Sequence, residues 1–112
     1  MAVIERIENA AQLDALFERS KERRVWIFKH SLTCSISSYA WGEFRRFAES
    51  VEGDVVFALI EVQTARMVSS DVARRLEIRH QSPQAILLRE GAVVWHASHF
   101  EIELAALRHI DS

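Results

Sequence analysis

The chain contains a single cysteine, and one thiol cannot form a disulfide within the chain. This excludes the small secreted domains that disulfides hold together, and it favours a reducing compartment. Proline occurs once and glycine three times, which is too rare for a flexible linker or a low-complexity tail. The single cysteine and the single proline are therefore the first positions to examine for a functional role.

Long apolar runs and a strong charge of either sign are also missing. The longest unbroken apolar stretch, Val55 to Ile60, is far shorter than the roughly 20 residues that span a bilayer. The first residues lack the basic and long apolar segments of a secretory signal. The formal net charge is −2, so neither nucleic acid nor a membrane is an expected partner. We expect a cytoplasmic protein that is a monomer or a weak dimer.

Apolar residues make up 49% of the 112 residues, which is enough for one hydrophobic core and predicts a single domain over residues 1–112. Apolar runs predict five strands, and spacings of three and four residues predict four helices. The expected strands are residues 2–7, 25–28, 55–60, 85–88 and 92–95, the last two joined as a hairpin. The expected helices begin after Asn9, after Cys34, at Ala65 and at Ser98.

The resulting order is β-α-β-α-β-α-β-β-α, in which the third and fourth strands are separated by the third helix. Strands that are apolar throughout are buried on both faces, so we expect an α/β fold with helices covering both faces of the sheet. The last helix is expected to run from a capping box at Ser98 and Glu101 through Ile110. Periodicity alone leaves the order of the strands in the sheet open.

Cys34 follows the apolar strand at residues 25–28 and precedes the helix that runs to about Ser50. A thiol at this place lies near the unpaired N–H groups and the positive end of the helix dipole, both of which favour the thiolate. It also lies at the carboxyl end of a strand, where ligands bind in open α/β sheets. The pattern makes Cys34 the candidate nucleophile.

Two segments of this chain resemble the thioredoxin-like superfamily and, within it, the monothiol bacilliredoxins of the YtxJ-like type. They are Phe28-Lys29-His30-Ser31 leading into Thr33-Cys34-Ser35-Ile36-Ser37, and His80-Gln81-Ser82-Pro83-Gln84. The resemblance implies a thioredoxin-like fold with a mixed five-stranded sheet. In this sheet the strand at 25–28 is central, with the strand at 55–60 on one side and the hairpin on the other. The family usually has proline where Ser35 stands here.

The resemblance also implies a cis Ser82–Pro83 bond, which would bring the backbone of Ser82 beside the sulfur of a bound substrate. A dithiol enzyme has its resolving cysteine three residues after the first, and Ser37 occupies that position. Cys34 is therefore limited to exchange with a sulfur from outside the chain. The implied activity is removal of bacillithiol, or a similar low-molecular-weight thiol, from mixed disulfides of client proteins, with that thiol as co-substrate and no tightly bound cofactor.

Several polar residues are candidates for supporting this chemistry. The hydroxyls of Thr33, Ser35 and Ser37 either donate to the thiolate or cap the helix. Lys29 and His30 point to opposite faces of their strand, so we expect a structural role for one, with electrostatic help from the other left open.

Substrate contacts are predicted in the loop before Pro83 and at the start of the last helix. Arg79 and His80 could meet the acidic groups of the small thiol, with Ser82, Pro83 and Lys29 completing the substrate site. The first turn of the last helix, at Ser98 and His99, could hold a carboxylate.

Other functions stay open from the residues alone. His96 and His99 have no acid or thiol at a matching spacing, so no metal site is expected. One alternative is a thiol-dependent iron–sulfur carrier that uses Cys34 across a dimer. The other is a redox-inactive binding adaptor of the thioredoxin fold, in which the cysteine has no catalytic role.

Overall fold

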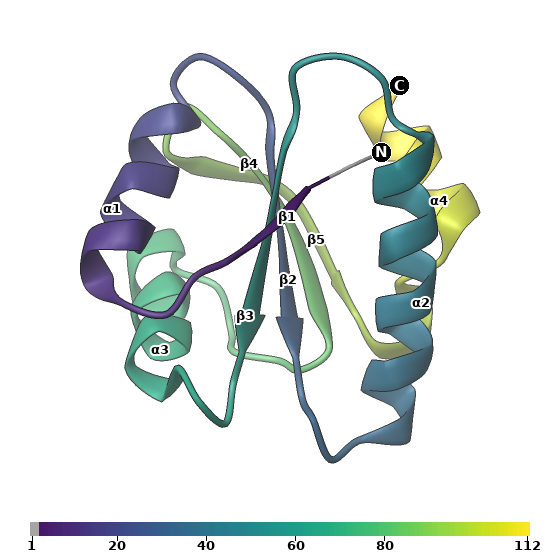
Figure 1. Ribbon diagram of the computed structural model, residues 1–112, viewed down its shortest axis with the longest axis horizontal. Coiled ribbons are helices and arrows are strands. Elements are labelled where there is room, and N and C mark those ends of the chain that lie inside the picture. The colour runs from purple at the N-terminus through teal and green to yellow at the C-terminus, as the bar shows by residue number, and fades with distance from the viewer. Residues whose placement is uncertain (1–2) are drawn as a thin grey trace.

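The computed structural model describes residues 3–112, which form one five-stranded sheet between two layers of helices (Figure 1). The strands are β1 (Ile4–Arg6), β2 (Val25–His30), β3 (Val56–Glu61), β4 (Gln84–Arg89) and β5 (Ala92–Ser98). The helices are α1 (Ala10–Arg19), α2 (Ser35–Ser50), α3 (Arg66–Leu76), the short 3-10 helix η1 (His99–Glu101) and α4 (Leu104–Asp111). This is the predicted order with η1 added. Residue 2 of the expected first strand lies outside the described residues.

The strand order in the sheet is β1-β3-β2-β4-β5, with β2 in the centre. β2 runs parallel to β3 and antiparallel to β4, so that Val25 pairs with Val56 on one side and Leu88 on the other. This mixed order is the one that the family resemblance implied. It places the carboxyl ends of β2 and β3 together at one edge of the sheet, where the Cys34 segment begins.

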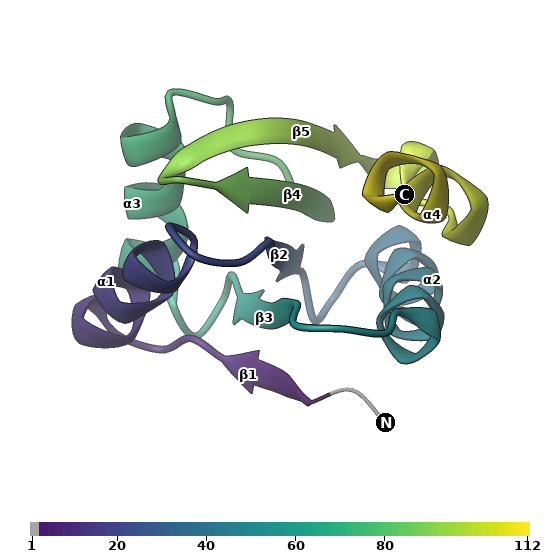
Figure 2. The same ribbon diagram turned by 90° about the horizontal axis from the view of Figure 1, so that it is seen from above.

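Helices cover both faces of the sheet, as the apolar character of the strands predicts (Figure 2). Val25 and Ile27 belong to the core beneath α1 and α3, whereas Trp26 and Phe28 belong to the core beneath α2 and α4. Alternation along β2 then assigns the next two residues to opposite faces. The Lys29 side chain therefore points to the face covered by α1 and α3, and the His30 side chain points to the face covered by α2 and α4.

Two local signals in the sequence form as expected. The side chain of Asn9 caps α1 by accepting a hydrogen bond from the Gln12 N–H at 2.9 Å. In the hairpin, Glu90 and Gly91 both have positive φ, 51° and 74°. This is the backbone that a two-residue turn with the strand twist requires. These signals fix the start of α1 and the register of β4 against β5.

The prediction of one continuous last helix is wrong. The capping box is present, and the Ser98 N–H donates to Glu101 Oε1 at 3.2 Å, but it opens only the short η1. The chain then turns extended at Ile102, whose side chain is fully buried in the core beneath α2. The extended backbone at Ile102 directs this side chain into the core and interrupts the helix, so α4 begins only at Leu104.

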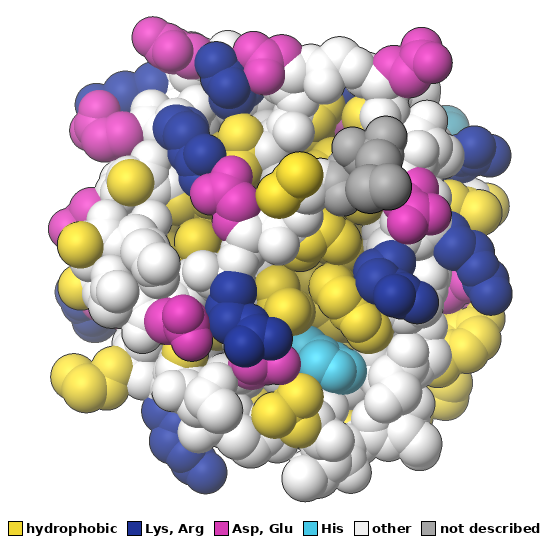
Figure 3. Space-filling model, in the orientation of Figure 1, with side chains coloured by type: hydrophobic (Ala, Val, Ile, Leu, Met, Phe, Trp, Pro, Cys, Tyr) yellow, Lys and Arg dark blue, Asp and Glu magenta, His cyan; other side chains and the backbone are white. Residues whose placement is uncertain are grey.

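Charged side chains of both signs are interspersed over the face shown in Figure 3, with hydrophobic side chains visible between the two helix layers. No large area of one sign is seen on this face, in keeping with the small net charge. No helix within residues 3–112 has the length and apolar character needed to cross a membrane.

Candidate functional site

Cys34 is the N-cap residue of α2, with extended backbone, and its thiol is half-buried. The Cys34 N–H lies 3.5 Å from the Ser31 carbonyl oxygen, and the Cys34 carbonyl accepts the Ser38 N–H at 3.1 Å. The Cys34 side chain makes no cap hydrogen bond. The first N–H groups of α2 therefore keep their capacity to stabilise a negative charge on the sulfur.

The three hydroxyls expected near the thiol have different surroundings. Thr33 Oγ1 accepts a hydrogen bond from Gln63 Nε2 at 3.4 Å, and Ser35 is exposed. Ser37 is fully buried, and its Oγ accepts the Ser31 N–H at 2.8 Å. The Ser37 hydroxyl, expected either to donate to the thiolate or to cap α2, instead bonds to the end of β2.

Ser37 also fixes His30. Ser37 Oγ lies 2.8 Å from His30 Nδ1, and the imidazole stacks on Trp41 with ring centroids 5.8 Å apart. Burial lowers the pKa of His30, against a smaller opposing effect of the Glu61 carboxylate. The position of the missing resolving thiol is thus occupied by a hydroxyl that ties the first turn of α2 to a neutral histidine on β2.

The Ser82–Pro83 peptide bond is cis, as the resemblance implied. Pro83 is buried, and its carbonyl oxygen accepts the His99 N–H at 3.2 Å. The Ser98 N–H is taken by Glu101, so neither of the two amides at the start of η1 is free for a substrate carboxylate. The Ser98 and His99 amides, which could have held a carboxylate, are thus already bonded within the chain.

Lys29, which was predicted as part of the substrate site, is completely buried and does not line the pocket surface. Its Nζ donates to the Ser69 carbonyl oxygen at 2.8 Å and lies 3.1 Å from His80 Nδ1. Burial lowers the pKa of Lys29 to about 8, so the amine still carries its proton at neutral pH. The strand thus supplies a buried cation on the α3 side of the sheet.

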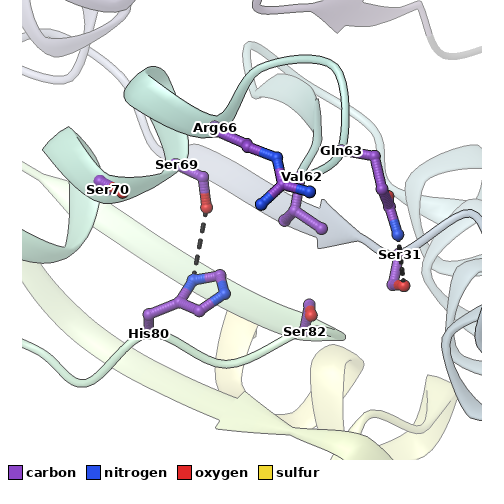
Figure 4. A pocket seen from close by; sticks show the side chains of 8 residues that line it. All are labelled: Ser31, Val62, Gln63, Arg66, Ser69, Ser70, His80 and Ser82. Atoms are coloured by element: carbon purple, nitrogen blue, oxygen red, sulfur yellow. Dashed lines mark hydrogen bonds between the residues drawn. The ribbon is translucent and has the colours of Figure 1, made fainter.

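A pocket of about 510 Å³ lies between the start of α3 and the loop that precedes β4 (Figure 4). Ser31, three residues before Cys34, forms part of its wall, and Ser82 lies with His80 on the side that faces Arg66. The lining residues are Ser31, Val62, Gln63, Arg66, Ser69, Ser70, His80 and Ser82. Two of the predicted substrate residues, His80 and Ser82, therefore meet in one cavity.

Arg79 is exposed and lies outside this lining, although its carbonyl oxygen accepts a hydrogen bond from Gln84 Nε2 at 3.1 Å. The basic residue in the pocket is instead Arg66, which sequence reasoning missed along with Gln63. Both follow the carboxyl end of β3, the strand beside β2. Ligands bind beyond the carboxyl ends of neighbouring parallel strands, so the loop after β3 could have been predicted to contribute to the same site as the loop after β2.

Gln63 joins the two loops that flank the pocket. Its Oε1 accepts the Leu32 N–H at 3.0 Å, and its Nε2 donates to Ser31 Oγ at 2.9 Å. One side chain from the β3–α3 loop therefore holds the backbone that leads into Cys34. The site as a whole combines an accessible thiol, an anion-stabilising helix start and an adjoining pocket, which are the parts that thiol exchange requires.

Comparison with solved structures agrees with this fold. A structure described as a candidate oxidoreductase with a thioredoxin fold has 28% identity and a TM-score of 0.87, with 98% of this chain and 95% of that chain covered. Thioredoxin from Malassezia sympodialis has 15% identity and a TM-score of 0.78, with 98% and 89% covered. Thioredoxin from Fasciola hepatica has 17% identity and a TM-score of 0.76, with 96% and 95% covered.

The family comparison is more specific than the fold. The family model for monothiol bacilliredoxin matches residues 5–107, which include the Cys34 segment and the cis-proline loop. The fold of this chain is that of thioredoxin-like oxidoreductases, and its family indicates a role in thiol redox chemistry. The chain belongs to the monothiol bacilliredoxin family.

Proposed function

We propose that this protein removes bacillithiol, or a similar low-molecular-weight thiol, from mixed disulfides of cytoplasmic client proteins. The observation that carries the proposal is the lone half-buried Cys34 at the start of α2, with the buried Ser37 hydroxyl at the resolving position. A nucleophilic sulfur is present in the site, and the chain has no second sulfur with which to close a disulfide.

The proposed reaction has two exchange steps. The Cys34 thiolate attacks the bacillithiol sulfur of the mixed disulfide, a Cys34–bacillithiol bond forms, and the client thiolate leaves and takes a proton from water. A second bacillithiol thiolate then attacks the adduct and releases Cys34, with the bacillithiol disulfide as the other product. In each cycle the client thiol is released, one free bacillithiol is consumed, and this molecule leaves as bacillithiol disulfide together with the bacillithiol that the client carried. The protein returns to its starting state.

The experiment that tests this proposal follows client release in the presence of free bacillithiol. A bacillithiolated client protein is incubated with the wild-type protein and with the Cys34→Ser variant. The wild-type protein should accelerate release of the client thiol, and the variant should give only the uncatalysed rate, because no nucleophile is left. Equal acceleration by the variant would show that Cys34 does not carry the reaction.

Absorbance and alkylation measurements separate the alternatives. A visible absorption band after iron and sulfide reconstitution, lost in Cys34→Ser, would support an iron–sulfur carrier instead. Alkylation of Cys34 no faster than that of an unstructured peptide thiol, together with no client release, would support an inactive adaptor.

A further inference from the structure

The pocket beside the Cys34 loop carries positive charge that no acid of the lining balances. Its lining contains no aspartate or glutamate. Arg66 forms no ion pair with any residue of the described chain, whereas Arg74 and Arg75, on the same helix, pair with Asp71 and Asp14. In Figure 4 the Arg66 guanidinium extends from α3 over the pocket, opposite His80 and Ser82. A guanidinium in this setting is a bidentate partner for a carboxylate.

A second cation lies beneath the pocket and also lacks a carboxylate. Lys29 is fully buried, and within residues 3–112 its Nζ is in hydrogen-bond range of two uncharged groups only, the Ser69 carbonyl oxygen and His80 Nδ1. An ammonium group removed from water without a counter-charge is costly. An anion in the pocket would offset that cost, so the buried lysine favours an anionic ligand over a neutral one.

Lys29 also sets the direction of the His80 ring. An ammonium group can only donate, so His80 Nδ1 accepts and the ring proton lies on Nε2. Burial, and to a smaller degree the Lys29 cation, lower the pKa of His80, so the ring is neutral at pH 7. Figure 4 shows the second ring nitrogen on the side away from Ser69, toward the space between Arg66 and Ser82. His80 therefore presents an N–H donor to the pocket.

Resting on the proposed function, we propose that this pocket binds the carboxylate of the low-molecular-weight thiol whose sulfur exchanges with Cys34. Arg66 binds the carboxylate through its guanidinium, the His80 Nε2–H adds a directed hydrogen bond, and Lys29 acts as a positioning residue beneath them. Cys34 does not line the pocket, but its N–H lies 3.5 Å from the carbonyl oxygen of Ser31, which does. In this proposal one small molecule reaches from the pocket to the Cys34 sulfur. Carboxylates are shared by bacillithiol and glutathione, and neutral thiols lack them.

The test compares two small symmetric disulfides, the dianionic dithiodipropionate and the neutral bis(2-hydroxyethyl) disulfide. In each case the Cys34 thiolate attacks one sulfur, forms a mixed disulfide and releases the other half as a thiolate. The ratio of the two rates, anionic over neutral, measures how strongly the pocket prefers a carboxylate. The rate with the neutral disulfide measures the reactivity of the Cys34 thiolate alone. Arg66→Gln should lower the ratio at least tenfold, because tenfold corresponds to about 1.4 kcal/mol, the lower end of what a hydrogen bond to a charged group contributes.

Matched variants show whether charge in the pocket is the cause. Arg66→Lys should keep more of the ratio than Arg66→Gln, and Lys29→Met should lower the ratio. Arg89→Gln removes the same charge at the hairpin, which is at the opposite end of the strands, and should leave the ratio unchanged. Raising the ionic strength should shrink the wild-type ratio toward that of Arg66→Gln.

The ratio also separates failure of this inference from failure of the proposed function. An Arg66→Gln ratio equal to that of wild type, with client release intact, would overturn the carboxylate pocket alone. Oxidised bacillithiol and oxidised glutathione then identify the source of the carboxylate. Arg66→Gln should slow whichever of the two reacts faster with the wild-type protein, and equal wild-type and variant rates for both would contradict the inference.

Discussion

Ser37 is the residue that most clearly distinguishes this site from a dithiol site. Its hydroxyl accepts the Ser31 N–H and contacts His30 Nδ1, both at 2.8 Å, in a fully buried position. Its position in the sequence predicted the missing resolving thiol. Its contacts show that it has a structural role in addition, because it joins α2 to β2 immediately behind the nucleophile.

We expect Ser37→Ala to lower the free energy of unfolding by about 1–3 kcal/mol, because two buried polar groups lose their partner. Urea unfolding followed by circular dichroism would measure the change. Ser35→Ala is the matched control, since Ser35 is exposed and its loss should change stability by less than about 0.5 kcal/mol. Equal effects of the two substitutions would contradict the assigned role of Ser37.

The buried His30 should make the free energy of unfolding depend on pH under acidic conditions. Its pKa is lowered by burial, so as the pH falls below about 6.5 the unfolded chain takes up the proton before the folded protein does. The free energy of unfolding should therefore fall below this pH. His30→Gln removes the titrating group and should flatten this part of the pH profile, measured by urea unfolding from pH 7 down to 4.5. The same acid slope in both proteins would exclude His30 as its source.

At the scale of elements, Gln63 shows how one loop orders another. Gln63 Oε1 accepts the Leu32 N–H at 3.0 Å, so Gln63→Ala should expose that amide and release the segment before Cys34. Hydrogen exchange should be faster at Leu32 in Gln63→Ala than in Thr64→Ala. Thr64 is an exposed neighbour whose hydroxyl donates to the Glu61 carbonyl oxygen at the end of β3, away from the Cys34 segment. Unchanged exchange at Leu32 would show that the backbone alone holds this segment.

The elements themselves could be predicted from the sequence because their signals are local. The two-sided apolar run of β2, the Asn9 cap and the positive-φ turn at Glu90 and Gly91 depend on residues close together in the chain. The break of the last helix at Ile102 could not, because it depends on where α4 packs against the core beneath α2.

The candidate site was predictable only in part, for the same physical reason. Cys34 and the cis bond before Pro83 follow from local sequence and the family resemblance. The pocket is lined by Arg66 and His80, and Lys29 contacts His80 from beneath it. The packing of α3 on the sheet brings these residues together. The spacing of apolar residues does not reveal such long-range contacts. The sequence therefore pointed to Arg79, which is next to His80 in the chain, and not to Arg66.

At the scale of the whole molecule, the buried Lys29 should shape stability at high pH. Its pKa is about 8 in the folded protein and about 10.4 when unfolded, so between these values only the unfolded chain holds the proton. The free energy of unfolding should then rise with pH across this window, by up to about 3 kcal/mol. Lys29→Met should lack the rise and should be no less stable at pH 7.

This prediction ties stability to function, because the same substitution is expected to weaken binding of the anionic thiol. Urea unfolding of both proteins from pH 7 to 10 would measure the effect. A wild-type profile with the same slope as that of Lys29→Met between pH 7 and 10 would contradict the uncompensated cation beneath the pocket.

The most direct test of the account is the mass of the intact protein after one exchange with a bacillithiolated client, in the absence of free thiol. We expect the client to lose one bacillithiol and this protein to gain one, located on Cys34 by peptide mapping and stable because no second cysteine can displace it. Release of the client thiol without an adduct on Cys34, or an adduct that also forms on Cys34→Ser, would contradict the monothiol exchange proposed here.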